Sequence, residues 1–183
     1  MSANTAANKS AKKLVHHPGN ELRRAYEHLG RIEILEGALA GSPFVDVTAL
    51  TNLAQQQLEA GNTGNAAALL EAAEHLCFAA LAPNRNYATQ SPMKADLKRT
   101  ITIEFEDLMQ RAEEHWEGEE EETNRRGIEE LFARALDQAR DAFTLGLFRP
   151  ALEFARAAEV LSHIRGSLPA TVADRGLVGQ LAS

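Results

Sequence analysis

The chain has 183 residues, which suits one domain or one compact bundle, and 44% of them are hydrophobic, which excludes wholesale disorder. The formal net charge of −7 argues against a general nucleic-acid binder, because phosphate contacts need a basic face. The single cysteine, Cys77, excludes an intrachain disulfide, and no apolar run reaches the roughly 18 residues of a membrane span, so we predict a cytoplasmic protein without membrane contact.

Residues 1–18 are small, polar and free of acidic side chains, and their three lysines predict a disordered basic tail. A first helix is expected to follow, with Asn20 as its N-cap and residues 41–43 as its end. Its apolar residues recur at spacings of three and four, which predicts a single buried stripe. The stripe comprises Leu22, Tyr26, Leu29, Ile32, Leu35 and Leu39.

Five more helices are expected along the chain. In the first half, one begins near Asp46 or Thr48 and ends at Ala60, and the next runs from about Asn65 to Leu81. In the second half, the helices are expected over residues 93–117, over 124–145, and from Pro150 to near Ile164. The sequence thus predicts an all-α fold with a first three-helix half (19–82), a proline-containing linker (83–92), a second three-helix half (93–166) and a flexible C-terminal tail (167–183).

One segment of the chain occurs twice. Residues Leu53–Leu76 and Gln138–Leu161 align without a gap at an offset of 85 positions, and seven of the 24 residues are identical. Each copy is expected to form a helix, a glycine turn and a second helix. Alanines seven residues apart share a helix face and let two backbones approach closely. The repeated small residues are Ala54 and Ala139, Gly61 and Gly146, Ala66 and Ala151, and Ala73 and Ala158.

This hairpin resembles a tetratricopeptide repeat. The family places a small residue on the first helix, a glycine at the turn, an aromatic two residues later, and two alanines seven apart on the second helix. The repeated positions follow that order, and Phe148 supplies the aromatic where the first copy has Thr63. The early tryptophan and the final proline of the family are absent, and the copies are 85 residues apart instead of in tandem at about 34. An alanine-rich helical bundle with a duplicated hairpin is the alternative interpretation.

A second family, the HEPN domains of prokaryotic toxins and nucleotide-handling proteins, offers a competing resemblance. The turn from Gly146 to Ala151 is similar to the glycine–aromatic–alanine turn of that family. Active members also carry an arginine followed by a histidine after four to six residues, a spacing that Arg23 and His28 match. In the family this motif follows the hairpin, whereas here it precedes both copies, which puts a catalytic role for the two residues in doubt.

Carboxylates gather around the end of the fourth predicted helix, beside Trp116. They are Glu113, Glu114, Glu117, Glu119, Glu120, Glu121 and Glu122. A calcium loop would need alternating Asp or Asn with glycine, which is missing, so a solvated acidic turn that could attract a basic partner is expected instead. Glu71 with His75, and Glu159 with His163, are spaced as surface pairs along a helix. We expect no metal and no cofactor.

The function that follows from these patterns is non-catalytic. The paired hairpins are expected to form an adaptor or scaffold that presents a groove to a protein or peptide, with a preference for basic ligands near residues 113–122. A homodimer through the first or the fourth predicted helix is a further expectation, because both carry long apolar stripes. The alternative is a HEPN-like RNA-acting or nucleotide-binding domain.

Overall fold

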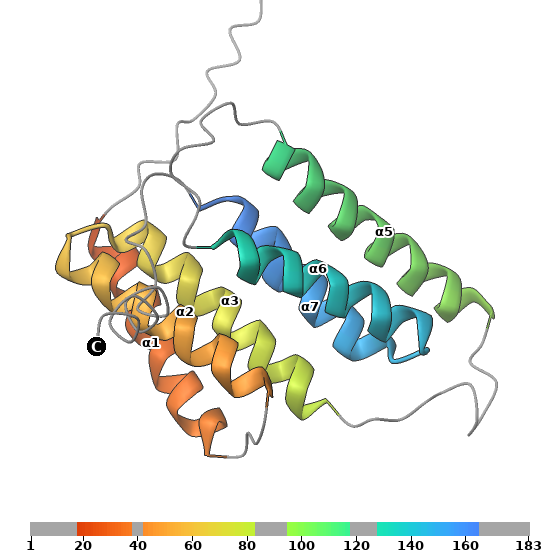
Figure 1. Cartoon of the computed structure of the whole chain (residues 1–183), viewed down its shortest axis with the longest axis horizontal. Coiled ribbons are helices and arrows are strands. Elements are labelled where there is room, and N and C mark those ends of the chain that lie inside the picture. Colours follow the sequence, from red (N-terminus) through yellow and green to blue (C-terminus); the bar gives the residue numbers. More distant parts are fainter. Residues whose placement is uncertain (1–17, 38–41, 83–94, 118–127, 165–183) are drawn as a thin grey trace, which may run out of the picture.

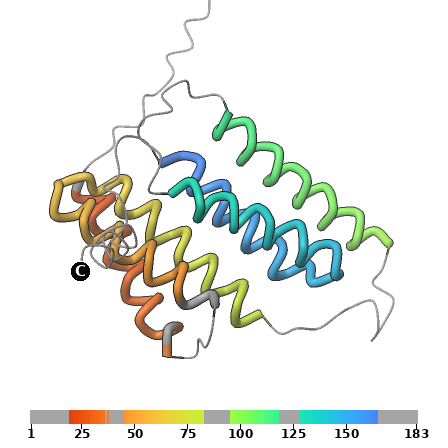
Figure 2. Tube along the Cα trace, in the orientation of Figure 1, coloured from red at the N-terminus to blue at the C-terminus, as the bar shows by residue number. Residues whose placement is uncertain are grey.

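The computed structural model of the chain describes residues 18–37, 42–82, 95–117 and 128–164 (Figures 1 and 2). Within these ranges the chain forms six α-helices and no strand, which confirms the predicted all-α class. The helices are α1 (Pro18–Glu36), α2 (Ser42–Glu59), α3 (Thr63–Leu81), α5 (Ala95–Glu117), α6 (Glu129–Thr144) and α7 (Phe148–Ser162). The predicted N-terminal tail before Pro18, the linker 83–92 and the tail 167–183 lie outside the described residues.

Helix α3 begins at Thr63, two residues before the predicted Asn65, and three further helices also begin earlier than the sequence suggested. Helix α1 begins at Pro18 and not after Asn20, α2 begins at Ser42 and not near Asp46, and α7 begins two residues before Pro150. In each of these three further helices a proline lies within the first turn, where a missing N–H costs no hydrogen bond and the fixed φ suits the helix. Prolines that were interpreted as boundaries therefore belong to the helices that follow them.

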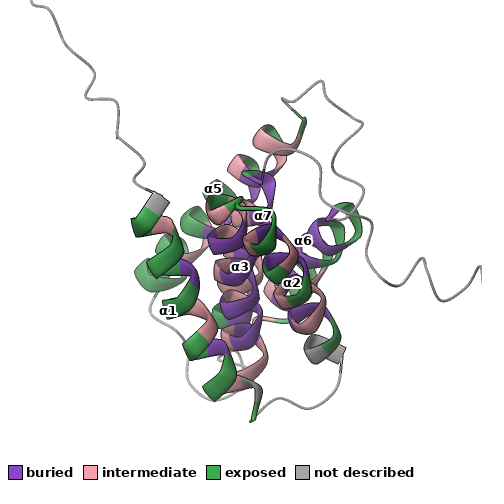
Figure 3. Ribbon diagram, turned by 90° about the vertical axis from the view of Figure 1, so that its left-hand side faces the viewer, coloured by how far each residue is buried: buried purple, intermediate pink, exposed green. Residues whose placement is uncertain are grey.

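Helices α3 and α7 form the centre of the bundle. Helix α3 packs against α1, α2 and α7, while α7 packs against α3, α5 and α6. The two central helices lie side by side and run in opposite directions (Figure 1). Figure 3 shows the result in burial: α3 is mainly buried, whereas α1 is exposed along its outer side. The fold is thus two groups of three helices joined through α3 and α7.

The contacts of the central helices depend on alanine. Each carries four or more fully or almost fully buried alanines, among them Ala72 and Ala73 on α3 and Ala157 and Ala158 on α7, all 0% exposed. A methyl side chain lets helix axes approach more closely than a leucine would, and larger residues such as Leu69 and Leu161 fill the space beside these contacts. None of the described helices is both long and apolar enough to cross a membrane.

The two hairpin turns have the same backbone structure. Gly61 and Gly146 adopt positive φ values of 80° and 73°. Gly61 N donates to Leu58 O at 3.0 Å, and Gly146 N donates to Phe143 O at 3.0 Å. The next residue in each copy also bonds five residues back, at 2.8 Å in both turns. The 85-residue sequence repeat is therefore a repeat of structure, and glycine is required at its turn because L side chains are strained at positive φ.

The turn glycine gives a direct test of this requirement. We expect Gly61→Ala to lower the free energy of unfolding by about 1–2 kcal/mol, because alanine is strained at φ +80°. Gly64→Ala is the matched control: Gly64 is helical, a Cβ there meets nothing within 4 Å, and the variant should be about 0.5–1 kcal/mol more stable. Urea unfolding followed by circular dichroism measures both, and equal changes in the two variants would contradict the argument.

Candidate functional site

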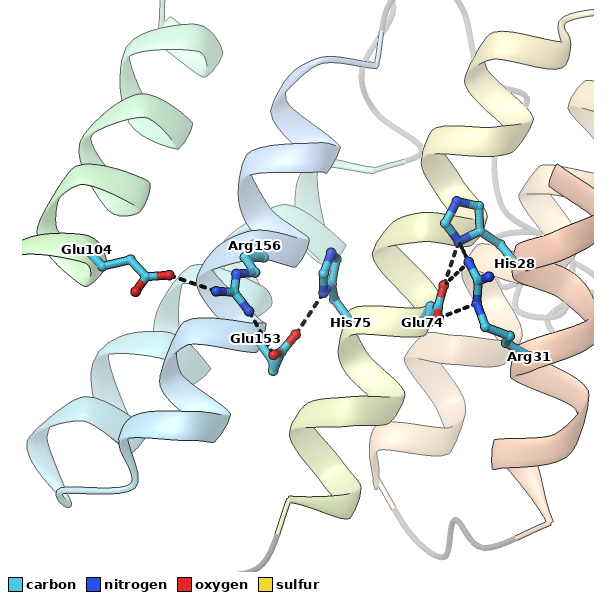
Figure 4. A network of polar contacts seen from close by, with 7 residues as sticks. All are labelled: His28, Arg31, Glu74, His75, Glu104, Glu153 and Arg156. Carbon is cyan, nitrogen blue, oxygen red and sulfur yellow. Dashed lines mark hydrogen bonds and ion pairs between the residues drawn. The ribbon is translucent and has the colours of Figure 1, made fainter. Parts of the chain in front are cut away.

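Arg23 and His28 lie on different faces of α1. The Arg23 side chain is largely exposed, and its Nε lies 3.4 Å from Oε1 of Glu27, one turn further along the same helix. His28 points toward α3, where its Nδ1 lies 2.5 Å from Oε2 of Glu74 (Figure 4). The two candidate catalytic side chains are therefore directed to different neighbours, and each has a partner that accounts for its position in the fold.

Glu74 on α3 is a buried carboxylate bound by two side chains of α1. Arg31 donates from Nε to Oε1 at 2.6 Å and from Nη2 to Oε2 at 3.0 Å, and His28 donates from Nδ1 to Oε2 (Figure 4). Burial by itself would raise the pKa of Glu74, but the hydrogen bonds from Arg31 and His28 outweigh it and leave that pKa below its usual value. The cluster fastens α1 to α3 and keeps the carboxylate charged.

A second polar network crosses the centre of the bundle. Arg156 on α7 donates to Glu104 on α5 at 2.7 Å and to Glu153 on its own helix at 2.9 Å. Glu153 also binds Nδ1 of His75 on α3 at 2.8 Å (Figure 4). Burial by itself would raise the pKa of Glu153. The hydrogen bond from His75 and the charge of Arg156 lower this pKa by more than burial raises it, so the net shift is downward. This network ties α5, α7 and α3 together.

These contacts replace the surface pairs that the spacing along the helices predicted. Glu71 binds Arg24 of α1 at 3.1 Å and not His75, which is directed to α7. Glu159 binds Arg111 of α5 at 2.6 Å. Both carboxylates form their ion pair with an arginine of the neighbouring helix, because a guanidinium offers a permanent charge with several donors. The charge of Glu159 still acts on His163, where it opposes the lowering of that pKa.

The ion pairs relate α1 to α5 position by position. Arg31 pairs with Glu74, and Arg111 pairs with Glu159, so an offset of 80 residues between α1 and α5 accompanies the offset of 85 between the hairpins. A second set of equivalent positions confirms the register with exchanged charges. Arg24 of α1 binds Glu71 of α3, whereas Glu104 of α5 binds Arg156 of α7. Helices α1 and α5 are therefore structural counterparts in the two groups of three helices.

The outer face of α1 carries three of the seven large apolar side chains that are exposed among the described residues; the other four are Val45, Leu97, Ile103 and Leu145. Leu22, Tyr26 and Ile34 are 38%, 60% and 79% exposed, and they follow one another along one flank of α1. Gly30 lies between the last two, and a Cβ built on it meets nothing within 4 Å. We call Leu22, Tyr26, Gly30 and Ile34 the α1 outer row. A glycine inside a helix costs about 1 kcal/mol relative to alanine, and no contact within the described chain requires it here.

Helix α5 provides an internal reference for this row. Its residues at the equivalent positions are Thr102, Glu106, Gln110 and Glu114, all of them polar. Both helices therefore occupy the same place in their group of three. At these four positions α5 is polar throughout, and the apolar side chains that it does expose, Leu97 and Ile103 at 52% and 57%, lie elsewhere on its surface. The fold therefore does not require apolar residues at these positions, because α5 occupies the equivalent place with polar residues there.

The candidate acidic binding residues are partly used within the fold. Glu113 forms an ion pair with Arg140 on α6, and Glu114 accepts a hydrogen bond from Gln110 at 2.7 Å. Trp116 stacks on Phe132 of α6 with ring centroids 4.1 Å apart, so it packs α5 against α6. Glu117 is exposed at the end of α5, and residues 119–122 lie outside the described residues.

A histidine pair lies near the end of α7. The rings of His115 and His163 are 4.1 Å apart between centroids, and His115 Nδ1 donates to the backbone oxygen of Arg111 at 2.8 Å. Burial and the nearby His115 lower the pKa of His163. In the part of the chain that the structure describes, no group of three or more His, Cys, Asp or Glu residues is placed to hold a metal ion.

The repeated positions of the hairpins are all structural. Six alanines at these positions are at most 1% exposed: Ala54, Ala66, Ala73, Ala139, Ala151 and Ala158. Phe148 packs edge-on against Phe143, with ring centroids 5.3 Å apart.

Comparison of the chain with protein-family models, with curated proteins and with solved structures finds no match in any of the three. The geometry of the described residues is therefore the basis for a functional proposal.

Sequence reasoning did not find the α1 outer row, because it assigned Leu22 and Tyr26 to the buried stripe. Ile32 of that stripe is buried as predicted, at 1% exposure, but Ala25 at 0% exposure is buried where Leu22 and Tyr26 are not. Two signals were present in the sequence. Ala25 fits the buried line of α1, and Ile34 falls outside the spacing of that line, so α1 carries a buried line and an exposed row side by side.

Proposed function

We propose that this protein is a non-catalytic protein–protein interaction module that uses the α1 outer row as its contact surface. The observation that carries the proposal is the contrast between Tyr26 and Ile34 on α1, which are 60% and 79% exposed, and the glutamates at the equivalent positions of α5. Contiguous apolar side chains on an exposed helix favour binding to another protein surface, and tyrosine is enriched among the residues that dominate such contacts.

The ionisable groups of the described chain support a non-catalytic role. Glu74 and Glu159 each bind an arginine of a neighbouring helix, Glu153 binds His75 of α3 and Arg156 of its own helix, and the lowered pKa values of Glu74 and Glu153 keep them charged. A general acid or base at neutral pH needs a pKa near 7 and an approach for substrate. The pKa values of Glu74 and Glu153 are shifted away from that range, and the contacts of all three carboxylates link one helix to another.

The experiment is affinity capture of the tagged protein from its own cell lysate, at two salt concentrations and after nuclease treatment. We expect a stoichiometric protein partner that resists nuclease, and we expect Tyr26→Ser with Ile34→Ser to reduce its capture at least tenfold. The matched control carries Glu106→Ser with Glu114→Ser on α5 and should capture normally. Equal capture by both variants would contradict the proposal. Co-purified RNA without a protein partner would favour the HEPN-like alternative.

A further inference from the structure

We propose that the partner of the α1 outer row is a second copy of this chain, so that the protein forms a homodimer through an antiparallel pair of α1 helices. The inference rests on the proposed function, since it names the partner of the same surface. A two-fold dimer requires a surface that is complementary to itself: wherever one residue meets another, the reverse contact must also be favourable. The α1 outer row meets this requirement in one orientation.

An antiparallel pair with its two-fold axis at the level of His28 brings unlike residues of the row together. Leu22 of one copy then lies at the level of Ile34 of the second copy, which places apolar side chains together at both ends. Tyr26 lies at the level of Gly30 of the second copy, where the missing side chain leaves room for the ring. Helices that pack closely have axes 8–10 Å apart, and glycine opposite an aromatic permits that approach.

Charge supports the same orientation. Arg23 and Glu33 are both exposed on the outer side of α1, beside the row. In the antiparallel pair, Arg23 of one copy lies at the level of Glu33 of the second copy, so two opposite-charge contacts flank the apolar residues. A parallel pair would place Arg23 beside its own counterpart and Tyr26 beside another tyrosine, which loses both complementarities.

Gly30 is a mid-helix glycine that the fold itself leaves unexplained, whereas Gly19 and Gly64, which also have nothing within 4 Å, lie in the first turns of α1 and α3. Gly30 lies inside α1, its φ is not in the positive range, and a Cβ there meets nothing within 4 Å. Apart from proline, glycine is the least favourable residue within a helix, so alanine would serve the isolated chain better. A close approach by a second helix gives the glycine a role. Its counterpart on α5 is Gln110, on a face where we expect no such approach.

The test measures the molar mass of the purified full chain by sedimentation equilibrium at micromolar to several hundred micromolar concentration. We expect a reversible dimer. Arg23→Glu and Glu33→Arg should each raise the dissociation constant about threefold to tenfold, and the double variant should restore it, because the opposite charges are then exchanged. Gly30→Leu should raise the dissociation constant more than tenfold while leaving the chain at least as stable to urea, and Gln110→Leu on α5 should leave it unchanged.

A monomer at every concentration would overturn the inference, and so would a dimer that is indifferent to Gly30→Leu. These outcomes are distinguishable from failure of the proposed function. If the chain is monomeric and the lysate experiment still depends on Tyr26 and Ile34, the α1 outer row binds a different protein and only the dimer is wrong. If neither experiment responds to α1 variants, both proposals are wrong.

Discussion

A Glu74→Gln variant is expected to lose about 2–3 kcal/mol of unfolding free energy at pH 7. Glutamine keeps the shape of the side chain but removes the charge that binds Arg31 and His28, and hydrogen bonds to charged groups contribute about 1.5–3 kcal/mol in such sites. Glu74 is 7% exposed, so water cannot replace the lost contacts fully. Urea unfolding of the full chain, followed by circular dichroism, measures the difference.

The loss should also depend on pH in a defined direction. The pKa of Glu74 in the folded chain lies below its ordinary value of 4.5, so the charged group stabilises the fold above that value. This stabilisation is lost as the pH falls through the lower folded pKa, because the proton then binds in both states. The difference between wild type and Glu74→Gln should therefore be constant from pH 7 to about 5 and should shrink below that.

Glu71→Gln is the matched control for this effect. Glu71 lies three residues before Glu74 on α3 and binds Arg24 of α1 through a single contact of 3.1 Å. The Glu71 side chain is 31% exposed and the Arg24 side chain is 48% exposed. Exposed ion pairs contribute about 0–1 kcal/mol, so this variant should lose less than half as much stability. If the two variants lose the same free energy of unfolding, then burial of Glu74 and its double contact with Arg31 do not determine how strongly α1 is held against α3.

Local signals in the sequence predicted the hairpins well. Gly61 and Gly146 were identified as turn residues, and both adopt positive φ. Such a turn can be predicted because it depends only on a few adjacent residues and on a glycine at the position of positive φ. Helix starts were less accurate, since Pro18 and Pro43 can end one helix or begin the next. Only the packing of the following residues decides between these outcomes.

Long-range polar contacts could not be predicted in the same way. Arg31 and Glu74 are 43 residues apart, and no periodicity in either helix indicates that they meet. The residue-by-residue correspondence between α1 and α5 was also hidden, although the two predicted three-helix halves place these helices equivalently. The offset is 80 residues for the first helices and 85 for the hairpins, so the second group of three has five more residues between equivalent positions, and one ungapped offset cannot align both. The exchanged charges at Arg24 and Glu104 further reduce the visible similarity.

Ala73→Leu and Ala158→Leu are expected to destabilise the chain by about 1–3 kcal/mol each, through overpacking of the central helices. Both alanines are 0% exposed and occupy equivalent positions of the repeat, so the two losses should agree to within about 1 kcal/mol. Ala133→Leu, at an exposed position of α6, is the matched control and should change stability by no more than about 0.5 kcal/mol.

Thermal unfolding of the three variants distinguishes the role of the repeat from that of burial in general. Comparable losses at Ala73 and Ala158 indicate that α3 and α7 approach their neighbours equally closely, as the common geometry of their turns requires. A loss at only one of them would mean that the second hairpin has room to adjust, and that the repeated alanines are equivalent in sequence but not in packing. Because the helix propensity of leucine is only slightly below that of alanine, helix propensity cannot account for a loss of about 1–3 kcal/mol at either site, which leaves steric crowding as its cause.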